Sequence, residues 1–209
     1  MSCDPRDGAG PFGDLLRALR QCKESRTCPS LRVRSYYFEP NPETAGAWRS
    51  EGLYQDEIDR RVMFFCESPS SSGSGTDSAA AQRNWAATFR DRRFWQILDK
   101  YGLANCYVTD LVKCGVRQED GHTEAEIEAC SPFLLREIEF IQPVIAVGVG
   151  ARAMRILRTR IAPRLEVPPV LFRITHYSAH GNPYQAWDQE FPELRRLLSR
   201  LRPRTQWEL

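Results

Sequence analysis

Three polar residues that can take part in chemistry each lie at or near the end of a segment typical of a strand. Glu67 comes directly after residues 62–66, Asp110 lies within 105–112, and His176 follows 170–175. Apolar runs such as 62–66 favour buried strands. The carboxyl ends of parallel strands meet at the sheet edge where α/β proteins bind their ligands. We therefore expect Glu67, Asp110 and His176 to lie together at one edge of a sheet.

Strand-like and helix-like segments alternate along the chain, and this predicts how those residues are positioned. The pattern predicts strands over 62–66, 105–112, 144–149 and 170–175, helices over 11–22, 84–101, 123–140 and 151–161, and a last helix capped by Asn182. Residues 32–38 are a further candidate edge strand. Alternation of this kind indicates an α/β three-layer sandwich with a central, mostly parallel four-stranded sheet flanked by helices. The length fits a single domain over 1–209, with 1–10 as a loose tail.

The composition argues against a membrane or secreted protein. The net charge is only +2, and no apolar run is long enough to span a bilayer. The first ten residues lack the charged-then-apolar layout of a signal peptide. We therefore expect a cytoplasmic protein with no membrane partner, and a monomer.

The seven cysteines are expected to be ligands or core residues, because disulfides are rare in the cytoplasm. Cys22 and Cys28 have five residues between them, and a proline closes the loop. Cys114 and Cys130 have fifteen residues between them. Cys66 and Cys106 lie in predicted strands and are expected in the core. Taken alone, the spacing of Cys22 and Cys28 is a weak ligand signal.

Four motifs in a fixed order resemble a known family. They are FFCESPS at 64–70, YVTDLVKC at 107–114, the helix-strand-helix segment from Cys130, and HYSA at 176–179. The first resembles the Gly-Glu-Ala-Pro-Gly motif of the iron-sulphur branch, family 4, of the uracil-DNA glycosylase superfamily. The second resembles its Tyr-Ile-Thr-Asn-Val-Val-Lys-Cys, and the last resembles its His-Pro-Ser-Ala. The resemblance runs from about Cys22 to the last helix.

The resemblance implies a DNA glycosylase that flips a base out of the duplex and cleaves its bond to the sugar. Glu67 would stabilise the sugar cation or orient the attacking water, and His176 would stabilise the departing base at its C2 oxygen. Asp110 would contact the base. Cys66, Ser70 and the ring of Phe89 would complete the base pocket. Contacts with the DNA backbone would come from Ser68, Pro69, Ser178, His180 and Asn182. Ordinary structural roles stay open, with His176 as a core histidine and Asp110 as a helix cap.

The family also implies a cofactor. Its [4Fe-4S] ligand positions fall here on Cys22, Cys28, Cys114 and Cys130. The first pair departs from the family's Cys-x-x-Cys spacing. Because four thiolates would equally satisfy structural zinc, zinc is the alternative.

Asp110 is the departure that bears on the substrate, because the family has a base-reading Asn at this position. An ionised Asp only accepts hydrogen bonds, and an exocyclic amine such as cytosine N4 is its natural partner. Plain cytosine is an unworkable target, since its removal would destroy the cell's own genome. We therefore expect a modified cytosine, such as the hydroxymethylated or glucosylated base of some phage DNA, and a role in phage defence. The small Ser70, where other branches have a bulky Tyr, leaves room for a substituent on C5.

Two alternatives remain open from the sequence. One is an ordinary uracil-DNA glycosylase of base-excision repair, in which a protonated Asp110 mimics Asn. The other is a non-catalytic iron-sulphur protein that binds nucleic acid through this fold. Formation of abasic sites on defined oligonucleotides separates these alternatives from an enzyme that excises modified cytosine.

Overall fold

The computed structural model describes Asp14, Leu15 and Ala18, together with residues 59–68, 89–113, 122–177, 179 and 181–201. Several predicted features lie outside these residues: the tail 1–10, the candidate strand 32–38, and the site residues Cys22, Cys28, Pro69, Ser70, Cys114, Ser178 and His180. Phe89 is described only as the first residue of a helix, without its side chain.

A four-stranded sheet forms the centre of the molecule, with strand order β2-β1-β3-β4. Every pairing is parallel. The strands are β1 (Asp59–Cys66), β2 (Cys106–Asp110), β3 (Ile145–Val149) and β4 (Val170–Ile174). This confirms the four predicted strands from residue 59 onward, and the sheet is wholly rather than mostly parallel.

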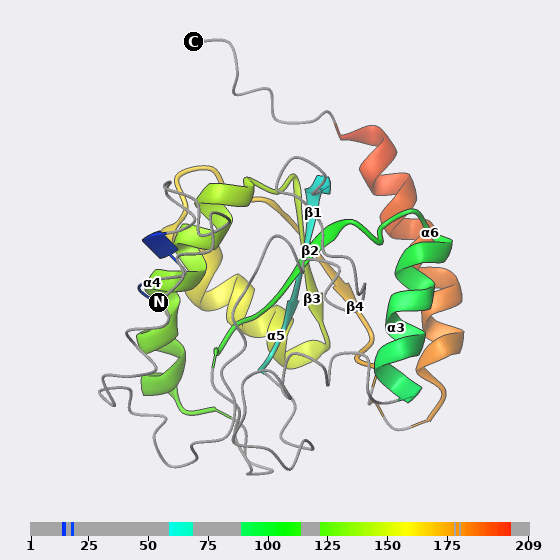
Figure 1. Cartoon of the computed structure of the whole chain (residues 1–209), viewed down its shortest axis with the longest axis horizontal. Helices are drawn as coiled ribbons and strands as arrows, with labels where there is room; N and C mark the ends of the chain where they lie inside the picture. The colour runs from blue at the N-terminus through cyan, green and yellow to red at the C-terminus, as the bar shows by residue number, and fades with distance from the viewer. Residues whose placement is uncertain are drawn as a thin grey trace, which may run out of the picture.

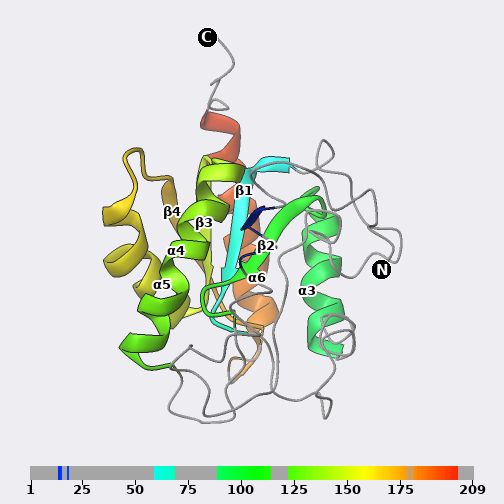
Figure 2. The same cartoon turned by 60° about the vertical axis from the view of Figure 1, so that its left-hand side comes forward.

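Helices cover both faces of this sheet, as Figures 1 and 2 show. α4 (Glu124–Ile141) and α5 (Ala151–Ile156) lie on one face, while α3 (Phe89–Lys100) and α6 (Pro183–Arg200) lie on the other. A π-helical turn (Leu157–Ile161) and a 3-10 turn (Ala162–Arg164) continue α5. The three-layer sandwich is therefore confirmed. No helix among the described residues is long and apolar enough to cross a membrane.

The core has two halves because side chains alternate between the faces of a strand. Met63 and Phe65 pack under α4 and α5, whereas Val62, Phe64 and Cys66 pack under α3 and α6. All five residues are nearly inaccessible to solvent, which explains why this strand is apolar throughout. Leu15, from the predicted first helix, packs in the α4 half. Cys66 and Cys106 belong to the α3/α6 half, so their expected place in the core is confirmed.

The helix ends follow from local sequence. Thr123 caps α4: its hydroxyl accepts a hydrogen bond from the Glu126 N–H, and the Glu126 carboxylate accepts one from the Thr123 N–H. This reciprocal pair is a capping box, which satisfies two backbone N–H groups at the start of the helix. Asn182 caps α6 through its side-chain oxygen, which accepts from the Tyr184 N–H at 3.2 Å. Pro183 occupies the first turn, where its missing N–H costs nothing.

Candidate active site

The strand register brings Glu67, Asp110 and His176 to the same edge of the sheet. Cys66 lies opposite Asp110 in the pairing of β1 with β2, and Val149 lies opposite Ile174 in the pairing of β3 with β4. Two backbone hydrogen bonds continue the first pairing past the strands, from Leu111 N to Cys66 O at 2.9 Å and from Val112 N to Glu67 O at 3.0 Å. The sheet therefore places two carboxyl groups on adjacent strand ends, with the histidine after the edge strand.

Asp110 is a buried carboxyl, and neither of its oxygens has a hydrogen-bond partner among the residues that the structure describes. Burial raises its pKa to about 8, and the nearby carboxylates of Glu137 and Glu67 act in the same direction against the opposing charge of Lys113. Asp110 therefore carries a proton at pH 7 in the DNA-free protein. The expectation of an ionised Asp110 was wrong, because a carboxylate without partners is costly to bury. A buried polar group left without a partner suggests that the partner is a ligand.

Glu67 lies beside an arginine that the sequence did not single out. Arg152 Nε, from the first turn of α5, is 3.1 Å from Glu67 Oε1, and both side chains are about 30% exposed. The Arg152 Nη2 group also donates to the backbone carbonyl of His122 at 2.8 Å. These contacts hold Arg152 against Glu67 from the side of α4 and α5. A charged pair that is still open to solvent can rearrange when DNA arrives.

His122 is a second residue that the sequence did not single out. Its side chain is buried, and Nδ1 lies 3.4 Å from Glu126 Oε2, with no hydrogen bond to either ring nitrogen among the described residues. Burial lowers the pKa of His122, and Glu126 opposes this shift. The imidazole is therefore neutral at pH 7. We assign His122 no catalytic step, because it contacts the site through its backbone carbonyl, which accepts from Arg152, and not through its ring.

His176 is held by its neighbours on three sides. Its ring stacks on Tyr177 at a centroid distance of 4.2 Å. Gly150 has a φ of 96°, and a Cβ on it would come within 3.1 Å of the His176 Cβ, so only glycine fits this approach. The preceding residue, Thr175, is fixed by α6: Glu190 accepts from its N–H at 2.8 Å and from its hydroxyl at 2.7 Å, while Trp187 Nε1 donates to its carbonyl at 2.8 Å.

The other predicted site residues fall into two groups. Cys66 is buried beside Asp110 in the strand register, and Ser68 is half-buried directly after Glu67. The exposed Asn182 uses its side-chain oxygen as the cap of α6. The base-pocket roles of Phe89 and Ser70, and the DNA contacts of Pro69, Ser178 and His180, lie outside the described side chains and stay predictions.

Cys130 is the one predicted cofactor ligand that the described residues include, so the full set of four thiolates stays a prediction. Its side chain is 3% exposed, and its sulfur accepts a hydrogen bond from the Lys113 N–H at 3.5 Å. The Lys113 backbone therefore contacts the Cys130 sulfur, and Cys114, the next residue in the sequence, lies outside the described residues. No group of three potential metal ligands occurs within the described residues, which exclude Cys22, Cys28 and Cys114.

Comparison with known proteins identifies the family. The family model for the uracil DNA glycosylase superfamily matches residues 53–202, which is most of the chain. The Type-4 uracil-DNA glycosylase of Saccharolobus solfataricus is 37% identical over 60 residues. That match covers 29% of this chain and 28% of the relative, so the aligned part is less than a third of either protein. Together with the parallel sheet and the polar residues at its carboxyl edge, the family match shows that the chain belongs to the uracil DNA glycosylase superfamily.

Proposed function

We propose that the chain is a DNA glycosylase that hydrolyses the N-glycosidic bond of a flipped-out modified cytosine and leaves an abasic site. The target class is hydroxymethylcytosine or its glucosylated form in phage DNA, and the biological role is phage defence. The observation that carries this proposal is Asp110, a buried carboxyl beside Glu67 whose two oxygens have no partner in the described part of the chain. Support for the reaction class comes from the superfamily match.

The reaction needs negative charge near the sugar. As the glycosidic bond breaks, positive charge develops on the sugar and negative charge on the departing base. Glu67 follows β1, and its carboxylate stabilises the sugar cation or orients the attacking water. Arg152 keeps this carboxylate in place before DNA binds, at an Nε–Oε1 distance of 3.1 Å.

The proton on Asp110 suits a cytosine-type base. A neutral carboxyl has one O–H donor and one carbonyl acceptor. Cytosine offers a lone pair at N3 and an amine at N4, so the O–H can donate to N3 while the carbonyl accepts from N4. When the bond to the sugar breaks, electron density moves into the ring and N3 becomes more basic. The hydrogen bond from Asp110 then strengthens in the transition state, which is the condition for catalysis by binding.

The raised pKa of Asp110 also favours one alternative, an ordinary uracil-DNA glycosylase. Uracil offers an acceptor at O4 and a donor at N3, and a neutral carboxyl can pair with both. The two bases differ in the atom that accepts the proton of Asp110, which is N3 in cytosine and O4 in uracil. We favour cytosine because its N3 is the stronger base, so the acid stabilises that leaving group more.

His176 is proposed to stabilise the departing base at its C2 oxygen. We expect His176→Ala to slow excision by roughly 10²–10³-fold, the usual effect of removing one donor to a developing anion. His176→Gln keeps an amide donor and should retain more activity than the alanine variant. Single-turnover excision on a duplex oligonucleotide measures both effects. A wild-type rate in His176→Ala would remove this residue from the mechanism.

The DNA contacts of the proposal follow the same edge of the sheet. Ser68, Pro69 and Ser178 contact the phosphates that flank the flipped nucleotide, and His180 to Pro183 enter the gap that the base leaves. Phe89 stacks on the flipped base, and Ser70 leaves space for the substituent on C5. Cys66 closes the pocket floor beside Asp110.

A [4Fe-4S] cluster is the proposed cofactor, held by Cys22, Cys28, Cys114 and Cys130. It would join the N-terminal segment to the end of β2 and the start of α4, and we assign it no step in base excision. Anaerobically purified protein should be brown and absorb near ~400 nm, as thiolate-bound clusters do. Cys130→Ser should lose most of this absorbance, whereas the core variant Cys106→Ser should keep it. Colourless protein that contains one equivalent of zinc would refute the cluster and keep the ligands.

Phage challenge tests the proposed function in cells. Bacteria that express the chain should reduce plating of a phage whose DNA carries glucosylated hydroxymethylcytosine. An isogenic phage with plain cytosine should plate normally, and Glu67→Gln should abolish the difference. Equal plating of both phages on cells that express the wild-type chain would contradict the defence role.

A further inference from the structure

The inference starts from a buried ion pair that the proposed mechanism does not use. Lys113 Nζ lies 2.6 Å from Glu137 Oε2, and the two side chains are 2% and 0% exposed. Lys113 follows β2, and Glu137 lies on the buried face of α4. Replacing a buried ion pair by apolar residues is often neutral or stabilising, so its presence is weak evidence for a role in stability. What surrounds the pair indicates its role.

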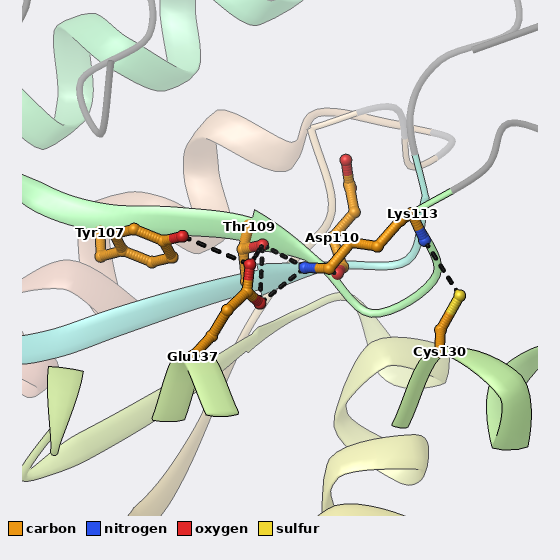
Figure 3. Close-up of polar contacts among 6 residues, drawn as sticks. All are labelled: Tyr107, Thr109, Asp110, Lys113, Cys130 and Glu137. Atoms are coloured by element: carbon orange, nitrogen blue, oxygen red, sulfur yellow. Dashed lines mark hydrogen bonds and ion pairs between the residues drawn. The ribbon is translucent and has the colours of Figure 1, made fainter. Parts of the chain in front are cut away.

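Lys113 is bound by three oxygens, and two of them belong to the end of β2. Its ammonium donates to Thr109 Oγ1 at 2.6 Å, to the Asp110 carbonyl at 2.7 Å and to Glu137. Three acceptors satisfy the three N–H groups of a lysine. Figure 3 shows the Asp110 side chain pointing away from this pair while its carbonyl faces Lys113. Lys113 therefore fixes the peptide from which the Asp110 carboxyl extends.

Glu137 completes the arrangement from α4. Its carboxylate accepts hydrogen bonds from Thr109 and from Tyr107, in addition to the bond from Lys113. Burial raises the pKa of Glu137, and the charge of Lys113 opposes this shift, as do these hydrogen bonds. Three donors and a cation favour a carboxylate at this position. Glu137 thus holds Lys113 and the end of β2 from the side of α4.

We propose that Lys113 and Glu137 are positioning residues for Asp110, which fix its backbone and set the charge state of its carboxyl through their own opposite charges. This deepens the proposed function, because it names the residues that control the base-reading carboxyl of Asp110. Its relevance to catalysis rests on that function. A purely structural ion pair would differ in its effect, because its loss would not shift the protonation of the Asp110 carboxyl in a direction set by the charge removed.

The charges that face Asp110 act with opposite signs. Lys113 lowers the pKa of Asp110, whereas Glu137 and Glu67 raise it, and Glu67 is itself paired with Arg152 of α5. Removing Lys113 should therefore raise this pKa, and removing the charge of Glu137 should lower it. A structural defect common to both variants would move the pKa of Asp110 in the same direction in each. Opposite shifts therefore indicate that the charges of Lys113 and Glu137 act on Asp110.

Infrared titration tests the proposal on the full chain without DNA. The carbonyl stretch of protonated Asp110 is assigned by its loss in Asp110→Asn, and its midpoint is followed with pH. We expect Lys113→Met to move the midpoint up and Glu137→Gln to move it down, each by about one pH unit, the low end for a neighbouring charge. The double variant should lie between the two. Glu128→Gln removes an exposed carboxylate of α4 that pairs with Arg164, so it should leave the midpoint unchanged.

The proposal is overturned if both single variants move the midpoint in the same direction, or if neither moves it. If Lys113→Met does not fold, the Glu137→Gln shift and the double variant still decide the outcome. The result does not depend on glycosylase activity, because the titration uses the DNA-free protein. Failure of the proposed function would appear separately, as a wild-type chain that forms no abasic site on any base.

Discussion

Glu67→Gln should bind DNA as tightly as wild type and lose roughly 10²–10⁴-fold in excision rate, the usual contribution of a positioned acid or base. The substitution keeps the size of the side chain and removes the charge that offsets the sugar cation. Single-turnover kinetics gives the rate, and fluorescence anisotropy gives the affinity. Both are measured with the substrate that wild type excises.

Arg152→Gln is the matched control for this prediction. It breaks the same ion pair, at an Nε–Oε1 distance of 3.1 Å, but leaves the Glu67 carboxylate. We therefore expect Arg152→Gln to retain much more activity than Glu67→Gln. Wild-type excision by Glu67→Gln would place the catalytic carboxylate elsewhere.

Asp110→Asn should shift base preference by about one to two orders of magnitude towards uracil, because a bidentate base contact is worth roughly 1–3 kcal/mol of discrimination. The amide offers uracil both partners that O4 and N3–H need. Against modified cytosine it can still pair with N4 and N3, but it cannot lend a proton to N3. The ratio of single-turnover rates on the two substrates measures this shift. An unchanged ratio would remove Asp110 as the residue that selects the base.

The same variant has a pH signature. Since burial raises the pKa of Asp110 to about 8, wild-type excision of modified cytosine should fall as pH rises through that value, and Asp110→Asn should lack this decline. The same proton also affects stability. The folded state keeps a proton on Asp110 that the unfolded state loses, so the contribution of Asp110 to the free energy of unfolding should fall by about 1.4 kcal/mol per pH unit between roughly pH 4 and pH 8 and then level off. Urea unfolding of wild type and Asp110→Asn at pH 5 and pH 7 isolates this contribution.

The sequence was sufficient to predict the fold and the residues at the sheet edge. A strand that is apolar throughout, such as Asp59–Cys66 from Val62 onward, is buried on both faces and requires helices on both sides. Parallel strands then bring their ends together, so Glu67, Asp110 and His176 had to share an edge. The cap of the last helix at Asn182 depends only on neighbouring residues, which is why it could be predicted without the fold.

The groups that set the position and charge of Asp110 and Glu67 reach them through contacts between residues far apart in the sequence. Such contacts could not be predicted from the sequence. Lys113 and Glu137 are 24 residues apart, and only the packing of α4 against β2 brings them together. Arg152 meets Glu67 because β1 and β3 are neighbouring strands, which places the start of α5 beside the end of β1. The protonation of Asp110 follows from its burial, which no local pattern reports. A charged residue at the helical spacing of apolar neighbours, as Glu137 is with Leu134 and Ile141 in α4, is the one signal that could have marked this network.

The most direct test of the account is the identity of the base that the protein releases. Duplex oligonucleotides that contain uracil, cytosine, hydroxymethylcytosine or glucosylated hydroxymethylcytosine are mixed in equal amounts, incubated with the chain at pH 7, and the free bases are measured by mass spectrometry. The account predicts that a modified cytosine is released, that plain cytosine stays in the DNA, and that Glu67→Gln releases nothing at a comparable rate. Preferential release of uracil would contradict the role proposed for Asp110, and release of no base at all would contradict the glycosylase function.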